Sequence, residues 1–73
     1  MLVVIVRERD GTKAKVASFA NEQLPEATDM LRSLLIHNKN VLRAVIYLDD
    51  TDMKEPKLLK IAKRGITGRI LIK

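Results

Sequence analysis

Four carboxylates lie close together in one short polar stretch of the chain: Asp49, Asp50, Asp52 and Glu55. Carboxylate oxygens are the ligands that Mg²⁺ and Ca²⁺ prefer. The spacing differs from that of an EF-hand loop, which needs acids at alternate positions, a central glycine and a later glutamate. We therefore interpret the stretch as a solvated turn, and we predict no metal site and no cofactor.

One histidine and two serines could serve in acid–base or nucleophilic chemistry: His37, Ser18 and Ser33. A Ser-His-Asp arrangement assembles in space rather than in sequence. However, the chain contains no strained nucleophile turn, and so short a chain leaves little volume for a cleft. Residues 65–68 lack the Lys-Ser/Thr pair of a phosphate-binding loop. We predict a protein that is not an enzyme and has no small-molecule substrate.

Basic side chains gather in the last third of the chain. Residues 54–73 carry a net charge of +6, whereas residues 1–53 sum to −1, and the whole chain is at +5. Arrays of Lys and Arg bind phosphates through counterion release, without reading sequence. The predicted nucleic-acid-binding residues are Lys57, Lys60, Lys63, Arg64, Arg69 and Lys73. A solvated, solubilising surface is the alternative interpretation of the same charges.

Length and composition indicate one small domain, residues 1–73. The chain has no cysteine, which fits a reducing compartment. No apolar run approaches the ~20 residues that a membrane-spanning helix needs. The first residues, Met1 to Val6, have no basic leader and do not resemble a secretory signal. We predict a cytoplasmic protein that does not bind membranes.

A run rich in β-branched residues, Leu2–Glu8, and an alternating run, Lys13–Phe19, flank the pair Asp10-Gly11. This pattern is typical of a β-hairpin. The loop length decides which face each side chain occupies, because a slip of one residue exchanges the faces. A two-residue loop pairs Val6 with Lys15.

A three-residue loop, residues 9–11, instead pairs Val6 with Ala14 and Val4 with Val16. It separates apolar from basic side chains more cleanly. It requires a positive φ at Gly11, which glycine permits. We favour the three-residue loop.

A helix is expected from Pro25 to His37-Asn38. Proline suits the first helical turn, and the residue before it is biased away from helix. The apolar stripe at helical spacing comprises Ala27, Met30, Leu31, Leu34 and Leu35. Residues 41–48 then alternate as a strand, and residues 49–52 form a polar turn.

The last third allows two interpretations. Pro56 could open a helix that Gly65 ends, followed by a strand over residues 69–73. Alternatively, residues 58–63 and 67–72 form a hairpin around 65–68. We favour the helix, because residues 57–64 are mostly good helix formers.

Together these elements predict a two-layer α+β fold of the order β-β-α-β-(α or β)-β. We expect a mixed sheet of three to four strands in the order 2-1-3(-4), with the main helix on one face. The other face would be open, apolar in the centre and basic toward the first turn. Such a patch usually marks a contact surface. Its predicted interface residues are Val3, Ile5, Val45 and Tyr47.

The functional prediction is a non-catalytic protein-interaction or regulatory module. Its partner would be another protein or a second copy of the chain, docked on the open sheet face. Nucleic-acid binding through the basic last third is the alternative. Salt dependence separates the two, because phosphate contacts give a steep slope and an apolar interface a shallow one.

Overall fold

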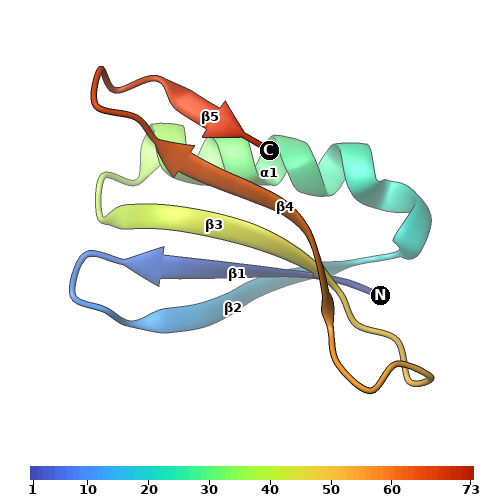
Figure 1. Cartoon of the computed structure of the whole chain (residues 1–73). Coiled ribbons are helices and arrows are strands. Elements are labelled where there is room, and N and C mark those ends of the chain that lie inside the picture. Colours follow the sequence, from blue (N-terminus) through green and yellow to red (C-terminus); the bar gives the residue numbers. More distant parts are fainter.

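The computed structural model describes residues 1–73 and consists of one sheet and one main helix (Figure 1). The strands are β1 (Leu2–Glu8), β2 (Lys13–Phe19), β3 (Val41–Leu48), β4 (Lys57–Arg64) and β5 (Ile70–Ile72). A short 3₁₀ turn, η1 (Asn21–Gln23), leads into the helix α1 (Leu24–His37). The α+β class, the first hairpin, the helix and the third strand are therefore as predicted.

The sheet has five strands in the order β2-β1-β3-β4-β5. Every neighbouring pair is antiparallel. The prediction of a mixed sheet with three to four strands was therefore wrong. Its strand order, with β1 between β2 and β3, is confirmed. Because β1 separates β2 from β3, the two strands that run in the same direction never pair.

The β1–β2 turn has the predicted three-residue loop. The Glu8 N–H donates to the Thr12 carbonyl at 2.9 Å, and the Gly11 N–H donates to the Glu8 carbonyl at 3.0 Å. Gly11 has a φ of +90°, a conformation that costs glycine little. The paired residues next to the turn, Val6 with Ala14, are those predicted.

Farther from the turn, the register of this hairpin shifts at a β-bulge. Val4 pairs with Ala17 and not with Val16, so the predicted pairing at that point was wrong. The extra residue moves Ala17 and Phe19 to the helix-covered face, where both pack against the core. A bulge of this kind inserts one residue and reverses the alternation beyond it.

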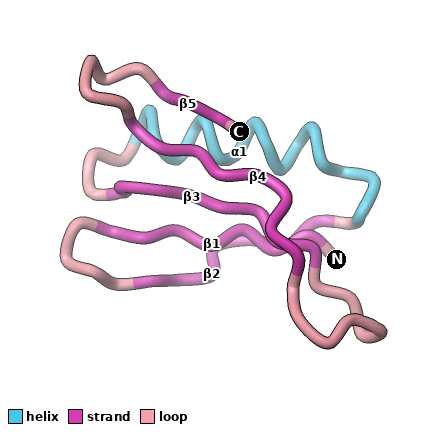
Figure 2. The backbone as a smooth tube through the Cα atoms, in the orientation of Figure 1, coloured by secondary structure: helices cyan, strands magenta, loops and turns pink.

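The segment Lys57–Arg64 is the strand β4, so the favoured helix was wrong and the alternative hairpin is confirmed. In Figure 2 the backbone of β4 bends sharply along its length and then turns back into β5. β4 pairs with β3 on both sides of a register shift. The β4–β5 turn repeats the geometry of the first turn. Gly68 has a φ of +84°, and the Gly65 N–H donates to the Arg69 carbonyl at 2.7 Å.

The core lies between α1 and one face of the sheet. α1 packs on β1, β3, β4 and β5. The fully buried side chains are all aliphatic: Leu2, Val4, Val6, Ala27, Leu31, Leu35, Val41, Ala44, Ile46 and Ala62. The helical stripe therefore meets alternate residues of the strands, as amphipathic periodicity requires. No helix of the chain has the length and apolar character to cross a bilayer.

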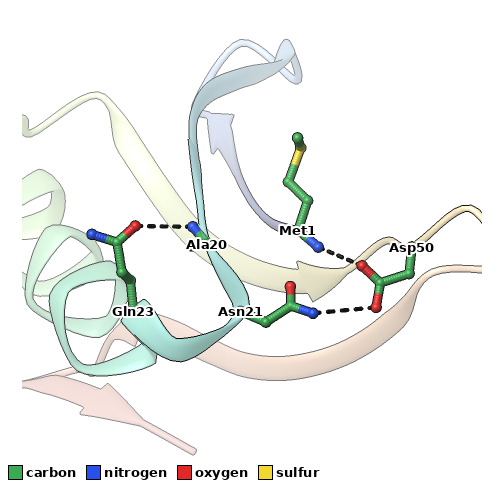
Figure 3. A network of polar contacts seen from close by, with 5 residues as sticks. All are labelled: Met1, Ala20, Asn21, Gln23 and Asp50. Atoms are coloured by element: carbon green, nitrogen blue, oxygen red, sulfur yellow. Dashed lines mark hydrogen bonds and ion pairs between the residues drawn. The ribbon is translucent and has the colours of Figure 1, made fainter.

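A small polar network joins the start of the chain, the lead-in to the helix and the end of β3 (Figure 3). The Met1 ammonium and the Asn21 side-chain amide donate to the two carboxylate oxygens of Asp50. The Gln23 side-chain carbonyl accepts from the Ala20 N–H at 2.9 Å. These contacts fix how the chain leaves β2 and enters α1.

Candidate binding surface on the open sheet face

The face of the sheet opposite α1 carries no other element (Figure 1). The side chains of this face line a groove. The groove has a volume of about 630 Å³. Its lining residues are Val3, Ile5, Val6, Arg7, Lys13, Arg43, Val45, Tyr47, Asp49, Glu55, Pro56, Leu58 and Ile61. The groove brings charged and apolar side chains together and is the candidate binding site.

Four cations stand side by side across one end of this face, and we call them the basic row: Lys13, Arg7, Arg43 and Lys63. Arg7 pairs with Lys13 of β2 on one side and with Arg43 of β3 on the other. Arg43 in turn pairs with Lys63 of β4. Neighbouring strands are about 4.8 Å apart, so the basic row crosses about 14 Å of sheet.

No carboxylate neutralises the basic row. The two ion pairs in the structure join the Met1 ammonium to Asp50 and Arg32 to Asp29, and neither includes a member of the row. Like charges on directly opposite residues of an antiparallel pair destabilise it. The row is thus a concentration of positive charge that the fold itself leaves uncompensated.

Apolar side chains form the floor next to the basic row. The adjacent line across the sheet runs through Ile5, Val45 and Ile61, which occupy paired positions. Lys15 of β2 pairs with Ile5 at one end of this line. Lys73 exchanges two backbone hydrogen bonds with Ile61 at the other end. Lysines therefore flank an apolar centre.

The next line across the sheet contains the single tyrosine. Tyr47 pairs with Val3 of β1 and with Leu58 of β4. All four predicted interface residues therefore lie in the groove: Val3, Ile5, Val45 and Tyr47. Tyr47 is only partly buried and lines the groove.

The opposite end of the groove is acidic. Asp49 and Glu55 line it where β3 leaves the sheet and β4 enters. Asp50 is occupied by the polar network, and the hydrogen bond from the terminal ammonium lowers the pKa of its carboxyl. No group of three or more His, Asp or Glu side chains comes together in a way that could hold a metal ion.

The six basic residues predicted to bind nucleic acid do not form one patch. Because residues 57–64 are a strand, alternate side chains point to opposite faces. Lys63 belongs to the basic row, and Lys73 lies on the same face beside Ile61. Arg64 points to the helix side, where its guanidinium donates to the carbonyls of Leu35 and Val41.

The other three of these residues lie elsewhere. Lys57 pairs with Leu48, and Lys60 pairs with the buried Ile46, so both occupy positions of the helix-side alternation. Arg69 is exposed in the β4–β5 turn. The single basic array predicted from the sequence is therefore divided between the two faces of the sheet and a turn.

Sequence reasoning missed the alignment of Lys63 with Arg43 and the groove residues of the last third. Leu58 and Ile61 complete the apolar floor, and Asp49 and Glu55 close its end. The signal that could have found them is the strand alternative for residues 57–64, which places Ile61 and Lys63 on one face.

Comparisons with protein-family models, with curated proteins and with solved structures give no match. The functional argument therefore rests on the residues of this surface.

Proposed function

We propose that this chain is a non-catalytic binding protein that holds a single-stranded nucleic acid on its open sheet face. The observation that carries the proposal is the basic row, four adjacent cations without a carboxylate partner. A polyanion lying on the row would remove the repulsion between its members. It would also release counterions, which is the main source of affinity for a phosphate backbone.

The rest of the face suits unpaired bases. Proteins that bind single strands combine a positive groove with side chains on which bases stack. Here the apolar line Ile5, Val45 and Ile61 lies next to the basic row, and Tyr47 lies in the line beyond it. Stacking on Tyr47 requires a base that is free of its duplex partner, which favours a single strand over a double helix.

The test is fluorescence anisotropy of a labelled single-stranded oligonucleotide, titrated at several salt concentrations. Each phosphate contact contributes about −0.7 to the slope of log K against log salt for single strands, so four contacts predict a slope of about −3. The double variant Arg7→Gln/Arg43→Gln should bind more weakly, and the magnitude of its slope should be smaller by about 1.4.

The matched control is Arg32→Gln/Lys54→Gln, which removes the same charge from the exposed side of α1 and from the β3–β4 loop. It should bind almost as the unaltered chain does. Equal losses in both double variants would mean that net charge, and not the basic row, attracts the oligonucleotide. Absence of binding at low salt would end the proposal.

The second candidate function is a protein-interaction or regulatory module, and the apolar floor of the same groove favours it. Its occupant would be an acidic segment of a partner protein or a second copy of the chain. Affinity capture from the source lysate, with and without nuclease, separates this candidate from the first. Partners that survive nuclease and are lost in Val45→Asp support it. Sedimentation of the pure chain as a dimer would identify a second copy as the occupant.

A further inference from the structure

The chemistry of the open face changes in order along the strands. The basic row comes first, and the apolar line with lysines at its ends follows. Next is the line of Val3, Tyr47 and Leu58, and the carboxylates of Asp49 and Glu55 come last. A ligand on this face therefore meets positive charge at one end of the groove and negative charge at the other end.

This order bears on the path of a bound strand. A nucleic acid that ran along the groove, parallel to β1 and β3, would carry its phosphates from the basic row to Asp49 and Glu55. Those contacts would be repulsive. A strand that crosses the β-strands keeps every phosphate on the basic row and turns its bases toward Tyr47.

We propose that the bound single strand crosses the sheet from β2 to β4, with its phosphates on the basic row and its bases over the apolar floor. The inference rests on the proposed function and adds the direction and length of the site. The basic row spans about 14 Å across three strand spacings. Sheet modules of comparable width stack two or three bases, so a footprint of about two to four nucleotides is expected.

A crossing path makes the outer members of the row as important as the central ones. Lys13 lies on the edge strand β2 and Lys63 on β4, whereas Arg7 and Arg43 are central. A nucleic acid that ran parallel to β1 and β3 would contact the central pair, Arg7 and Arg43. It would leave the outer pair, Lys13 and Lys63, free. The two paths therefore predict different consequences for the same loss of charge.

The experiment compares Lys13→Gln/Lys63→Gln with Arg7→Gln/Arg43→Gln by anisotropy against salt. The crossing path predicts that each double variant reduces the magnitude of the slope by about 1.4, since each removes two phosphate contacts. It also predicts that affinity stops rising once the oligonucleotide exceeds about four nucleotides. A normal slope in the outer variant would overturn the crossing path.

A third variant, Asp49→Asn/Glu55→Gln, checks the acidic end independently. The crossing path predicts an affinity within about twofold of the unaltered chain at moderate salt, where charges more than about 10 Å away are screened. A large gain in affinity, together with a longer footprint, would show that the strand runs along the groove. If neither the unaltered chain nor any variant bound single-stranded oligonucleotides, the proposed function itself would be wrong, and the proposed path with it.

Discussion

The guanidinium of Arg64 on β4 donates a hydrogen bond to the main-chain carbonyl of Leu35, which lies in the last turn of α1. The last four carbonyls of a helix have no partner within it and carry the negative end of its dipole. The same guanidinium donates to the Val41 carbonyl at 3.3 Å, at the start of β3. One cation thus ties the end of the helix to the sheet.

Replacing Arg64 with leucine should lower the free energy of unfolding by about 1.5–3 kcal/mol, the usual contribution of hydrogen bonds to a charged group. The stability of Arg64→Lys should lie between those of the unaltered chain and Arg64→Leu, because lysine keeps the charge and loses the planar pair of donors. Urea unfolding monitored by circular dichroism measures both. Arg69→Leu is the control, since Arg69 is exposed. An equal loss in Arg69→Leu would contradict this role of Arg64.

The basic row should reduce the stability of the free protein. Arg43 faces cations on both neighbouring strands. We therefore expect Arg43→Gln to raise the free energy of unfolding by about 0.2–1 kcal/mol while it weakens oligonucleotide binding. Thermal unfolding without ligand measures the gain. Arg32→Gln, on the exposed side of α1, should change stability by less than about 0.5 kcal/mol. Destabilisation by Arg43→Gln would show that the row is not repulsive.

Two turns require a left-handed backbone. Gly11 and Gly68 have φ values of +90° and +84°, and no atom lies within 4 Å of a Cβ built at either position. The cost of Gly→Ala is therefore conformational, and we expect about 1–2 kcal/mol at each position. Asparagine tolerates this conformation better, so Gly11→Asn should lose less. Equal losses for alanine and asparagine in urea unfolding would exclude this explanation.

Acid should weaken the first hairpin through Asp10. Hydrogen bonds from Thr12, from its side chain first and then its backbone N–H, hold the pKa of Asp10 below its ordinary value of 3.8. A carboxyl with a lowered pKa in the folded state contributes stability that is complete above 3.8 and is lost as the pH falls through the folded value.

The measurement is the urea midpoint at neutral pH and well below pH 3.8. The midpoint of the unaltered chain should fall with acid more than that of Asp10→Asn, because asparagine keeps an acceptor that does not titrate. Some decrease remains in the variant, since Asp50 titrates in the same direction. Identical decreases in the two proteins would assign the acid sensitivity to other groups.

The early part of the fold was predictable because local patterns and tertiary packing agree there. The loop of residues 9–11 followed from the need to separate core from solvent, and the φ of Gly11 confirms it. The bulge at Val16 was not predictable from alternation. It becomes necessary only when Phe19 must reach the core beside α1.

The segment 57–64 was misassigned for a physical reason. Its register with β3 shifts between Ile46 and Tyr47, which leaves Leu59 as an extra residue. Because of the bulge, Leu58 and Ile61 lie on one face of the sheet although they are three residues apart in sequence. Leu59 and Ala62 share the other face at the same separation. A separation of three residues is also typical of one helix face. Pairing with β3 then overrides the helix propensity of the segment, as tertiary context often does.

The candidate surface was partly predictable. The hairpin register placed Arg7 and Lys13 on the open face, and strand alternation placed Val45 and Tyr47 there. The fourth member of the basic row could not be found, because Lys63 was assigned to a helix. A row of charges across a sheet is visible only when the strand order and every register are known.

The place of β1 between β2 and β3 also bears on the order of folding. The β1–β2 and β4–β5 hairpins have short turns, and such hairpins form within about 1–10 μs. The seam between β1 and β3 joins residues as distant as Leu2 and Leu48, so its closure carries the larger loop entropy. We expect this seam to form in the transition state and the β4–β5 hairpin to dock against β3 afterwards. Kinetic traces should then show Val4→Ala slowing refolding and Ile72→Ala mainly accelerating unfolding.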